Sequence, residues 1–154
     1  MNISWKSASK GEIPKGAIVA GFESNGTPLF LCRAKFGKGM PIDQGLISGK
    51  GMVPGKVRKE FGAANVGLAG KEVKMKDYEV YCGGAKWEKA SNGNIPTGAI
   101  VVGNEPGGAP LYAARAEIRN GLHPGKVRPE FKGAMIPFGN IETLATAYEI
   151  LVEK

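Results

Sequence analysis

The octapeptide PGKVRKEF at residues 54–61 occurs again as PGKVRPEF at residues 124–131, with seven of eight positions identical. A second alignment places Trp5 on Trp87 and gives 17 identities over 30 consecutive positions. Two separate blocks that each align with a later copy indicate an internal duplication, and duplicated segments are expected to share one structure. The sequence therefore predicts two copies of one structural unit.

The two alignments differ in their offset, and the difference locates an insertion. The first block is displaced by 82 positions and the second by 70, so the first copy carries 12 extra residues. They fall in a stretch rich in glycine and lysine at about residues 37–52. We therefore predict a first repeat over residues 1–84, which includes the insertion, and a second repeat over residues 85–154.

The periodicity within each copy is typical of strands. GAIVAGF (16–22) and PLFLCRA (28–34) are short apolar runs rich in β-branched residues. Asn25-Gly26 lies between them and predicts a two-residue hairpin turn with positive φ at both central positions. The segments KVRKEF and DYEVYC, and their counterparts in the second copy, alternate with period two, which also predicts strands.

Helices are disfavoured by composition, because the 24 glycines and 10 prolines would each weaken a helix interior. Only IETLATAYEILV has helical propensity, and its counterpart KEVKMKDYEVYC has less of it. The predicted fold is all-β: two pseudo-symmetric tandem repeats of short antiparallel strands, intertwined into one compact unit in which each repeat closes the core of the other.

A pattern spaced through both copies carries a family resemblance. It reads W, G-x-I-P-x-G-A-I-x-x-G-x-E, P-L, R-A, P-G-K-V and Y-E in that order. This pattern resembles the DM-nine (DM9) repeat family, whose tandem members include mannose-binding lectins that act as pattern-recognition proteins in invertebrate immunity. The resemblance implies a homodimer that binds mannose, mannose-containing glycans or microbial surface polysaccharides without metal or other cofactors.

The resemblance also implies which residues bind the sugar. In the lectin members, an acidic residue after the first hairpin strand and the lysine of Pro-Gly-Lys contact the sugar. Glu23 and Lys56 hold these positions in the first repeat, and Glu105 and Lys126 hold them in the second. The lectins carry Asp where this chain has Glu.

Glutamate and lysine can also form a sugar clamp on chemical grounds. A carboxylate accepts hydrogen bonds from vicinal hydroxyls while an ammonium donates to them, and such charge-assisted bonds contribute roughly 1.5–3 kcal/mol each. The alternative is that Glu23 and Lys56 form a solvent-exposed ion pair and that Pro-Gly is an ordinary turn. Arg58 and Arg128 lie two residues beyond each lysine, on the same strand face. They are either further ligand donors or partners of internal ion pairs, which Glu60 and Glu130 could supply only across strands.

Several other classes of site are excluded by residue type. His123 is the only histidine and has no nucleophilic motif around it, so we expect a loop histidine and no enzyme. The two aspartates do not form a calcium-binding pattern, and Gly-Lys lacks the rest of a nucleotide-binding loop. Cys32 and Cys82 are expected to be reduced, half-buried thiols. Trp5 and Trp87 are expected to be core anchors.

Charge distinguishes the two copies. The formal net charge is +7, and all of the excess lies in residues 1–86. A basic cluster brackets the insertion, formed by Lys35, Lys38, Lys50, Lys56, Arg58 and Lys59. The alternative function is therefore binding of anionic surfaces, phosphorylated lipids or acidic glycans through the basic face of the first repeat. Nucleic acid is not expected, because no aromatic residues are interleaved with the cluster.

The location of the protein is predicted from the absence of targeting signals. The first 16 residues contain no apolar run, and no stretch approaches the roughly 18 apolar residues of a membrane span. A cytoplasmic protein is expected, and release of the protein from the cell without a leader peptide remains an open alternative.

Overall fold

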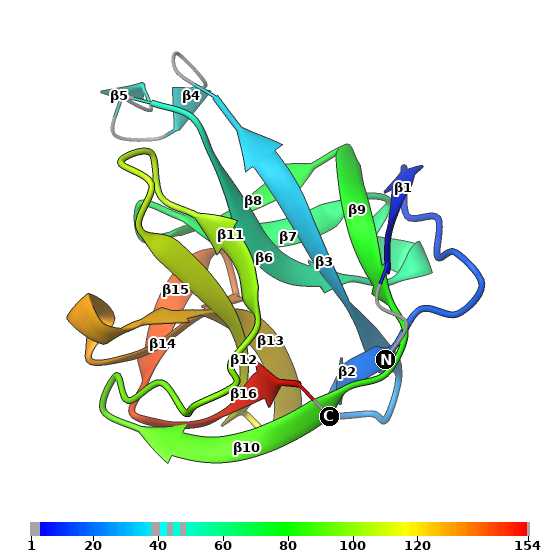
Figure 1. Ribbon diagram of the computed structural model, residues 1–154. Helices are drawn as coiled ribbons and strands as arrows, with labels where there is room; N and C mark the ends of the chain where they lie inside the picture. Colours follow the sequence, from blue (N-terminus) through cyan, green and yellow to red (C-terminus); the bar gives the residue numbers. More distant parts are fainter. Residues whose placement is uncertain (1–3, 38–40, 43–44, 47–48, 154) are drawn as a thin grey trace.

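The computed structural model describes residues 4–37, 41–42, 45–46 and 49–153. Within these ranges the regular structure is antiparallel strand apart from two short 3-10 helices (Figure 1). The predicted all-β fold is therefore confirmed. None of the helices in the described ranges is long and apolar enough to cross a membrane.

Each repeat contributes the same series of elements. The first repeat contains β1 (Ser4–Ser9), β2 (Val19–Phe22), β3 (Pro28–Phe36), β6 (Gly51–Val57), η1 (Lys59–Phe61), β7 (Ala64–Leu68), β8 (Lys71–Met75) and β9 (Asp77–Cys82). The second contains, in the same order, β10 (Lys86–Ser91), β11 (Val101–Asn104), β12 (Pro110–Ile118), β13 (Gly121–Arg128), η2 (Pro129–Phe131), β14 (Gly133–Phe138), β15 (Ile141–Ala145) and β16 (Ala147–Val152).

The two series are interleaved in one sheet rather than placed side by side. Strand β2 pairs with β13, β6 pairs with β11, and β8 pairs with β15, so three pairings join the repeats. The sheet also closes on itself, because β3 pairs with β6 as well as with β2. The predicted intertwining is confirmed by these pairings.

The core has one part for each repeat and one part that the repeats share. The shared cluster contains Ala20, Leu31 and Tyr81 from the first repeat and their counterparts from the second, namely Val102, Ala113 and Leu151. Trp5 and Trp87 pack against this cluster while half-buried. Neither repeat alone can therefore cover its apolar side chains.

The Pro-Gly-Lys segments are not turns, which corrects the sequence prediction. Residues 54–56 lie within β6, where they pair with both β3 and β7. A Cβ at Gly55 would clash with the carbonyl oxygen of Asn65 on β7, and Gly125 is crowded in the same way by Met135. Glycine is therefore required here because two backbones approach closely, not because the chain reverses direction.

Two further local predictions need correction. The hairpin between β2 and β3 is longer than predicted: the amide of Gly26 donates to the carbonyl of Glu23, and the amide of Glu23 donates to Thr27. Gly26 has a positive φ of 92°, and Asn25 does not have positive φ. In KVRKEF the strand ends at Val57 and η1 follows. IETLATAYEILV is extended as predicted, forming β15 and β16.

The insertion lies in the connection between β3 and β6. In the second repeat the equivalent connection is a tight turn at Arg119-Asn120, both with positive φ. In the first repeat it contains β4 (Pro41–Ile42) paired with β5 (Gly45–Leu46). Residues 38–40, 43–44 and 47–48, and with them Lys38 of the predicted basic cluster, lie outside the described residues.

The two cysteines are free thiols, and both are buried rather than half-buried. Burial raises the pKa of the Cys32 thiol. A buried neutral thiol packs as a small apolar side chain and is a poor nucleophile.

Candidate functional site

The predicted glutamate and arginine of the first repeat meet in space. Glu23 lies at the end of the β2–β3 hairpin, and Arg58 follows the last residue of β6. Arg58 Nε donates a 2.9 Å hydrogen bond to Glu23 Oε2, and the guanidinium lies 4.4 Å from the ring centre of Phe61. Both charged side chains are partly exposed. The result is a carboxylate, a guanidinium and a phenyl ring within reach of one ligand.

The second repeat builds the same arrangement more loosely. Arg128 Nε lies 3.3 Å from Glu105 Oε2, and the guanidinium is 5.0 Å from the ring centre of Phe131. Among the described residues Arg128 Nε has no acceptor with hydrogen-bond geometry. Nε is buried, and Arg128 and Glu105 therefore interact as an ion pair and not through a hydrogen bond.

The arginines also pair with glutamates of their own segment, whereas we expected such pairs only across strands. Arg58 Nη1 donates a 3.0 Å hydrogen bond to Glu60, and Arg128 Nη1 lies 3.7 Å from Glu130. The strand ends just before Arg58 in the first repeat and at Arg128 in the second, and in both a 3-10 helix begins at the residue after the arginine. This change of direction brings the glutamate back toward the arginine two residues before it.

Lys56 was expected on the surface, but it is buried. The residue is 3% exposed. Its Nζ lies 2.9 Å from His123 Nδ1, 3.8 Å from Glu72 Oε2 and 5.2 Å from the ring centre of Phe138. His123 and Phe138 belong to the second repeat, so this lysine joins the two halves of the fold.

Lys126 is buried in an equivalent place but has different partners. The residue is 6% exposed, and its Nζ donates a 2.9 Å hydrogen bond to the carbonyl oxygen of Gly67 in the first repeat. Glu142 Oε1 lies 3.0 Å from Nζ without the angle of a hydrogen bond, so this contact is an ion pair. Both Pro-Gly-Lys lysines are therefore internal charges that cross from one repeat to the other.

The glutamates beside these lysines connect a turn of the first repeat to the equivalent turn of the second. Glu142 accepts a 2.9 Å hydrogen bond from the amide of Gly70, and Glu72 accepts a 3.0 Å hydrogen bond from the amide of Asn140. Backbone hydrogen bonds run parallel to these, from Glu72 to Asn140 and from Glu142 to Gly70. We call this reciprocal set of bonds the turn clasp.

His123 is a strand residue and not the loop residue that was predicted. It lies in β13, is 1% exposed, and packs edge-on against Phe138 with 4.8 Å between ring centres. Its Nε2 is 3.7 Å from Glu23 Oε1. His123 therefore lies between the buried Lys56 and the partly exposed Glu23.

The environment of His123 favours the neutral imidazole. Burial and the charge of Lys56 lower its pKa to about 4, and Glu23 opposes this shift. Burial also lowers the pKa of Lys56, against the carboxylates of Glu72 and Glu23. A protonated Lys56 cannot accept a hydrogen bond, so Nδ1 is the acceptor and the imidazole hydrogen is on Nε2.

We expect the stability of the protein to depend on His123 between pH 6.5 and 4. In this window the unfolded chain takes up a proton at an ordinary pKa of about 6.5, whereas folded His123 does not. The free energy of unfolding is therefore expected to fall by up to about 3 kcal/mol as the pH is lowered from about 6.5 to about 4. Urea unfolding at several pH values measures it.

The control for this prediction is His123→Gln, which keeps an acceptor for Lys56 but does not titrate. The difference in unfolding free energy between parent and variant is expected to change across the window and to be constant above it. Parallel pH curves for the two proteins would mean that His123 titrates normally in the folded state.

Several residues of this site were missed from the sequence although a signal existed. Phe61 and Phe131 lie within the repeated octapeptide, and Glu72 and Glu142 are identical between the aligned blocks. His123 had no such signal, because its counterpart in the first repeat is Val53. Where the two repeats carry different residues at one position, only the three-dimensional structure shows that such a residue belongs to the site.

No three His, Cys, Asp or Glu side chains gather as potential metal ligands in the part of the chain that the structure describes.

Comparison with known families agrees with the duplicated pattern. No curated protein matches the chain. The DM9 repeat matches over residues 1–42 and 46–145. The chain therefore belongs to the DM9 repeat family, and this membership supports a carbohydrate-binding type of domain.

Proposed function

We propose that the protein is a metal-independent lectin that binds mannose-type glycans and acts as a pattern-recognition protein for microbial polysaccharides. The observation that carries this proposal is a partly exposed carboxylate–guanidinium pair beside a phenyl ring, built at the same place in both repeats. We call each such set a clamp, with Glu23, Arg58 and Phe61 in the first and Glu105, Arg128 and Phe131 in the second.

The chemistry of each clamp suits a sugar. The carboxylate accepts hydrogen bonds from two neighbouring hydroxyl groups, the guanidinium donates to their oxygens, and the ring offers an apolar surface to the C–H face of the pyranose. In the first clamp Glu23 Oε2 is bonded to Arg58, and Oε1 lies toward His123 at 3.7 Å, too far for a hydrogen bond. The expected cation of the clamp was Lys56, but Arg58 holds that position. Lys56 lies in the interior behind the clamp, where it contacts His123. We propose binding without catalysis, and a homodimer would present four clamps.

The alternative through the basic face of the first repeat loses part of its support. Lys56 is buried, and Arg58 is bonded to two glutamates. Lys35, Lys50 and Lys59 are exposed. The described members of the predicted cluster therefore do not form one continuous cationic surface, and the cluster as a whole does not carry a second function.

Calorimetry with a mannose oligosaccharide tests the proposal. Glu23→Gln and Glu105→Gln are each expected to remove one site, because the charged acceptor is lost while the shape is kept. A loss of about 2 kcal/mol per site corresponds to roughly thirtyfold weaker binding. The parent should show two sites, each single variant one, and the double variant none.

The charge-matched control is Glu153→Gln, which changes an exposed glutamate near the C-terminus. It should bind as the parent does. If the double variant binds the oligosaccharide with the parent's affinity and stoichiometry, the clamps are not the sugar sites and the proposal fails.

A further inference from the structure

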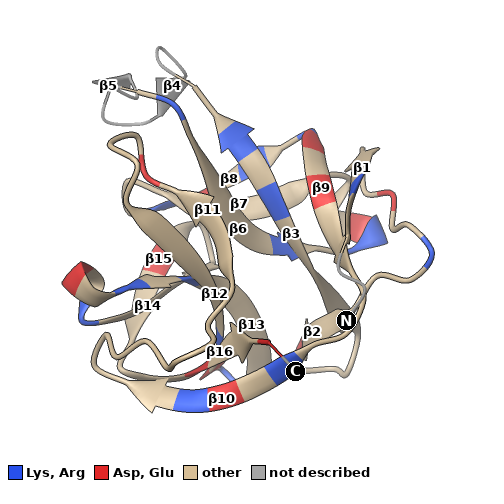
Figure 2. Cartoon of the chain, in the orientation of Figure 1, with Lys and Arg blue, Asp and Glu red and all other residues tan. Residues whose placement is uncertain are grey.

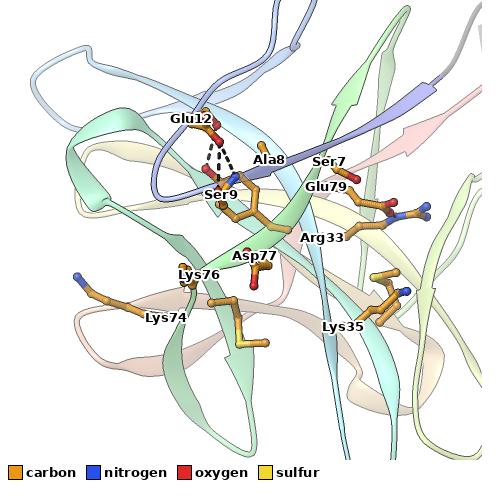
Figure 3. Close-up of a pocket in the computed structure, with 13 residues that line it drawn as sticks. Ser7, Ala8, Ser9, Glu12, Arg33, Lys35, Lys74, Lys76, Asp77 and Glu79 are labelled. Carbon is orange, nitrogen blue, oxygen red and sulfur yellow. Dashed lines mark hydrogen bonds and ion pairs between the residues drawn. The ribbon is translucent and has the colours of Figure 1, made fainter.

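A groove lies on the first repeat apart from the clamps. Its volume is about 760 Å³, and β1, β3, β8 and β9 contribute residues to its walls. On one wall Arg33 lies beside Glu79 (Figure 3), and its Nε donates a 2.7 Å hydrogen bond to that carboxylate. Nη1 of the same arginine donates to the carbonyl of Val102 in the second repeat. None of the residues that line the groove belongs to a clamp.

The second repeat has an equivalent groove of about 650 Å³. Its wall contains the same ion pair, formed by Arg115 and Glu149 at 2.8 Å. Tyr78 and Tyr148 also occupy matching positions in the two grooves. The two grooves are therefore equivalent in the two repeats, and the lining residues that differ between them distinguish one groove from the other.

Five charged residues of the first groove are replaced in the second repeat, namely Glu12, Lys35, Lys74, Lys76 and Asp77. Three of these, Lys35, Lys74 and Asp77, correspond to Glu117, Leu144 and Ala147 of the second repeat. Figure 2 shows the basic residues of β3 beside the acidic residues of β9. In Figure 3, Asp77 lies between Lys35 on one side and Lys74 on the other.

The side chains of Lys35, Lys74 and Asp77 are exposed and have no ion-pair or side-chain hydrogen-bond partner among the described residues. Glu12 of the same groove differs, because its Oε1 accepts from both the amide and the hydroxyl of Ser9. The groove thus holds one free acceptor between Lys35 and Lys74, and the exposed Lys76 adds a third cationic side chain to its lining.

We propose that this groove binds an acidic saccharide, with sugar hydroxyls on Asp77 and the carboxylate or sulfate groups of the sugar on Lys35 and Lys74. A saccharide fits better than a phosphate or a lipid headgroup, because Asp77 repels a ligand that brings only negative charge and no hydroxyl donors to the centre. The walls suit such a ligand, since they combine polar groups with the half-buried Met52 and Met75.

The test uses a heparin hexasaccharide, which carries hydroxyl, carboxylate and sulfate groups, with the full chain and calorimetry. The parent is expected to bind it at about 0.05 M salt and more weakly at about 0.5 M, where screening is stronger. Lys35→Glu combined with Lys74→Leu installs the residues of the second repeat and should weaken binding at least about tenfold. Lys59→Gln, which changes an exposed lysine outside the groove, should leave it unchanged.

Asp77→Asn separates a saccharide site from a simple basic surface. If Asp77 accepts sugar hydroxyls, the variant should bind the hexasaccharide about three- to tenfold more weakly. Tighter binding by this variant, or unchanged binding by the lysine double variant, would overturn the proposal. Stronger binding to phosphatidylserine vesicles than to the hexasaccharide would assign the surface to lipid and overturn it as well.

This inference does not rest on the clamps. Glu23→Gln and Glu105→Gln are expected to bind the hexasaccharide as the parent does, and the groove variants are expected to keep both mannose sites. Failure of one proposal is therefore distinguishable from failure of the other.

Discussion

A fragment of residues 1–84 is expected to remain unfolded when it is expressed alone. In the whole chain β2, β6 and β8 are paired with strands of the second repeat, and half of the shared core comes from that repeat. The fragment would expose both the strand edges and the apolar cluster. Its thermal unfolding, followed by circular dichroism, should show no cooperative transition.

Mixing this fragment with residues 85–154 is the matching control. The two halves together should recover a cooperative transition, because every pairing between repeats can form again. Native-like NMR dispersion from the first fragment alone would show that the repeats are independent units and that their interleaving does not stabilise them.

Lys126→Met is expected to lower the free energy of unfolding by about 3–5 kcal/mol. The substitution leaves the carboxylate of Glu142 buried, with a side chain 4% exposed, and removes its cation. It also leaves the carbonyl of Gly67 without its donor. A solvent-exposed lysine at this position would instead contribute little to stability. Urea unfolding of parent and variant measures the difference.

Two further variants make this expectation specific. Lys59→Met changes an exposed lysine and should shift stability by no more than about 0.5 kcal/mol. Adding Glu142→Gln to Lys126→Met should recover part of the loss, because no unpaired charge stays buried while Gly70 keeps its acceptor. A cost below about 1 kcal/mol for Lys126→Met alone would mean that water reaches the pair.

The sequence predicted the fold well because the evidence for it was repeated. Matching blocks indicated the duplication, the difference between the offsets of the two blocks indicated the insertion, and strand periodicity indicated the all-β class. Glu23 and Glu105 could be named as candidate ligands because the family pattern includes them, but the cation predicted beside each was the lysine of Pro-Gly-Lys. The cation that meets each glutamate most closely is an arginine of the octapeptide.

The burial of the lysines could not be predicted from local sequence. Pro-Gly has the composition of a turn. No residue near Lys56 in the sequence indicates that β7 pairs closely beside Gly55 or that His123 of β13 contacts the lysine. The contact between Lys56 and His123 joins residues 67 positions apart. The grooves were missed for the same reason, since Arg33 and Glu79 are distant in sequence and meet only when β3 and β9 pair.

The turn clasp has a consequence for how such a chain can change. Two identical, separate repeats could form the same reciprocal bonds as a symmetric dimer, but every substitution would then appear on both sides of the axis. In a single chain the copies vary independently. Lys56 can contact an imidazole where Lys126 contacts a carboxylate, and one groove can gain charges that the other lacks. Covalent fusion thus turns a symmetric assembly into a protein whose equivalent surfaces can serve different ligands.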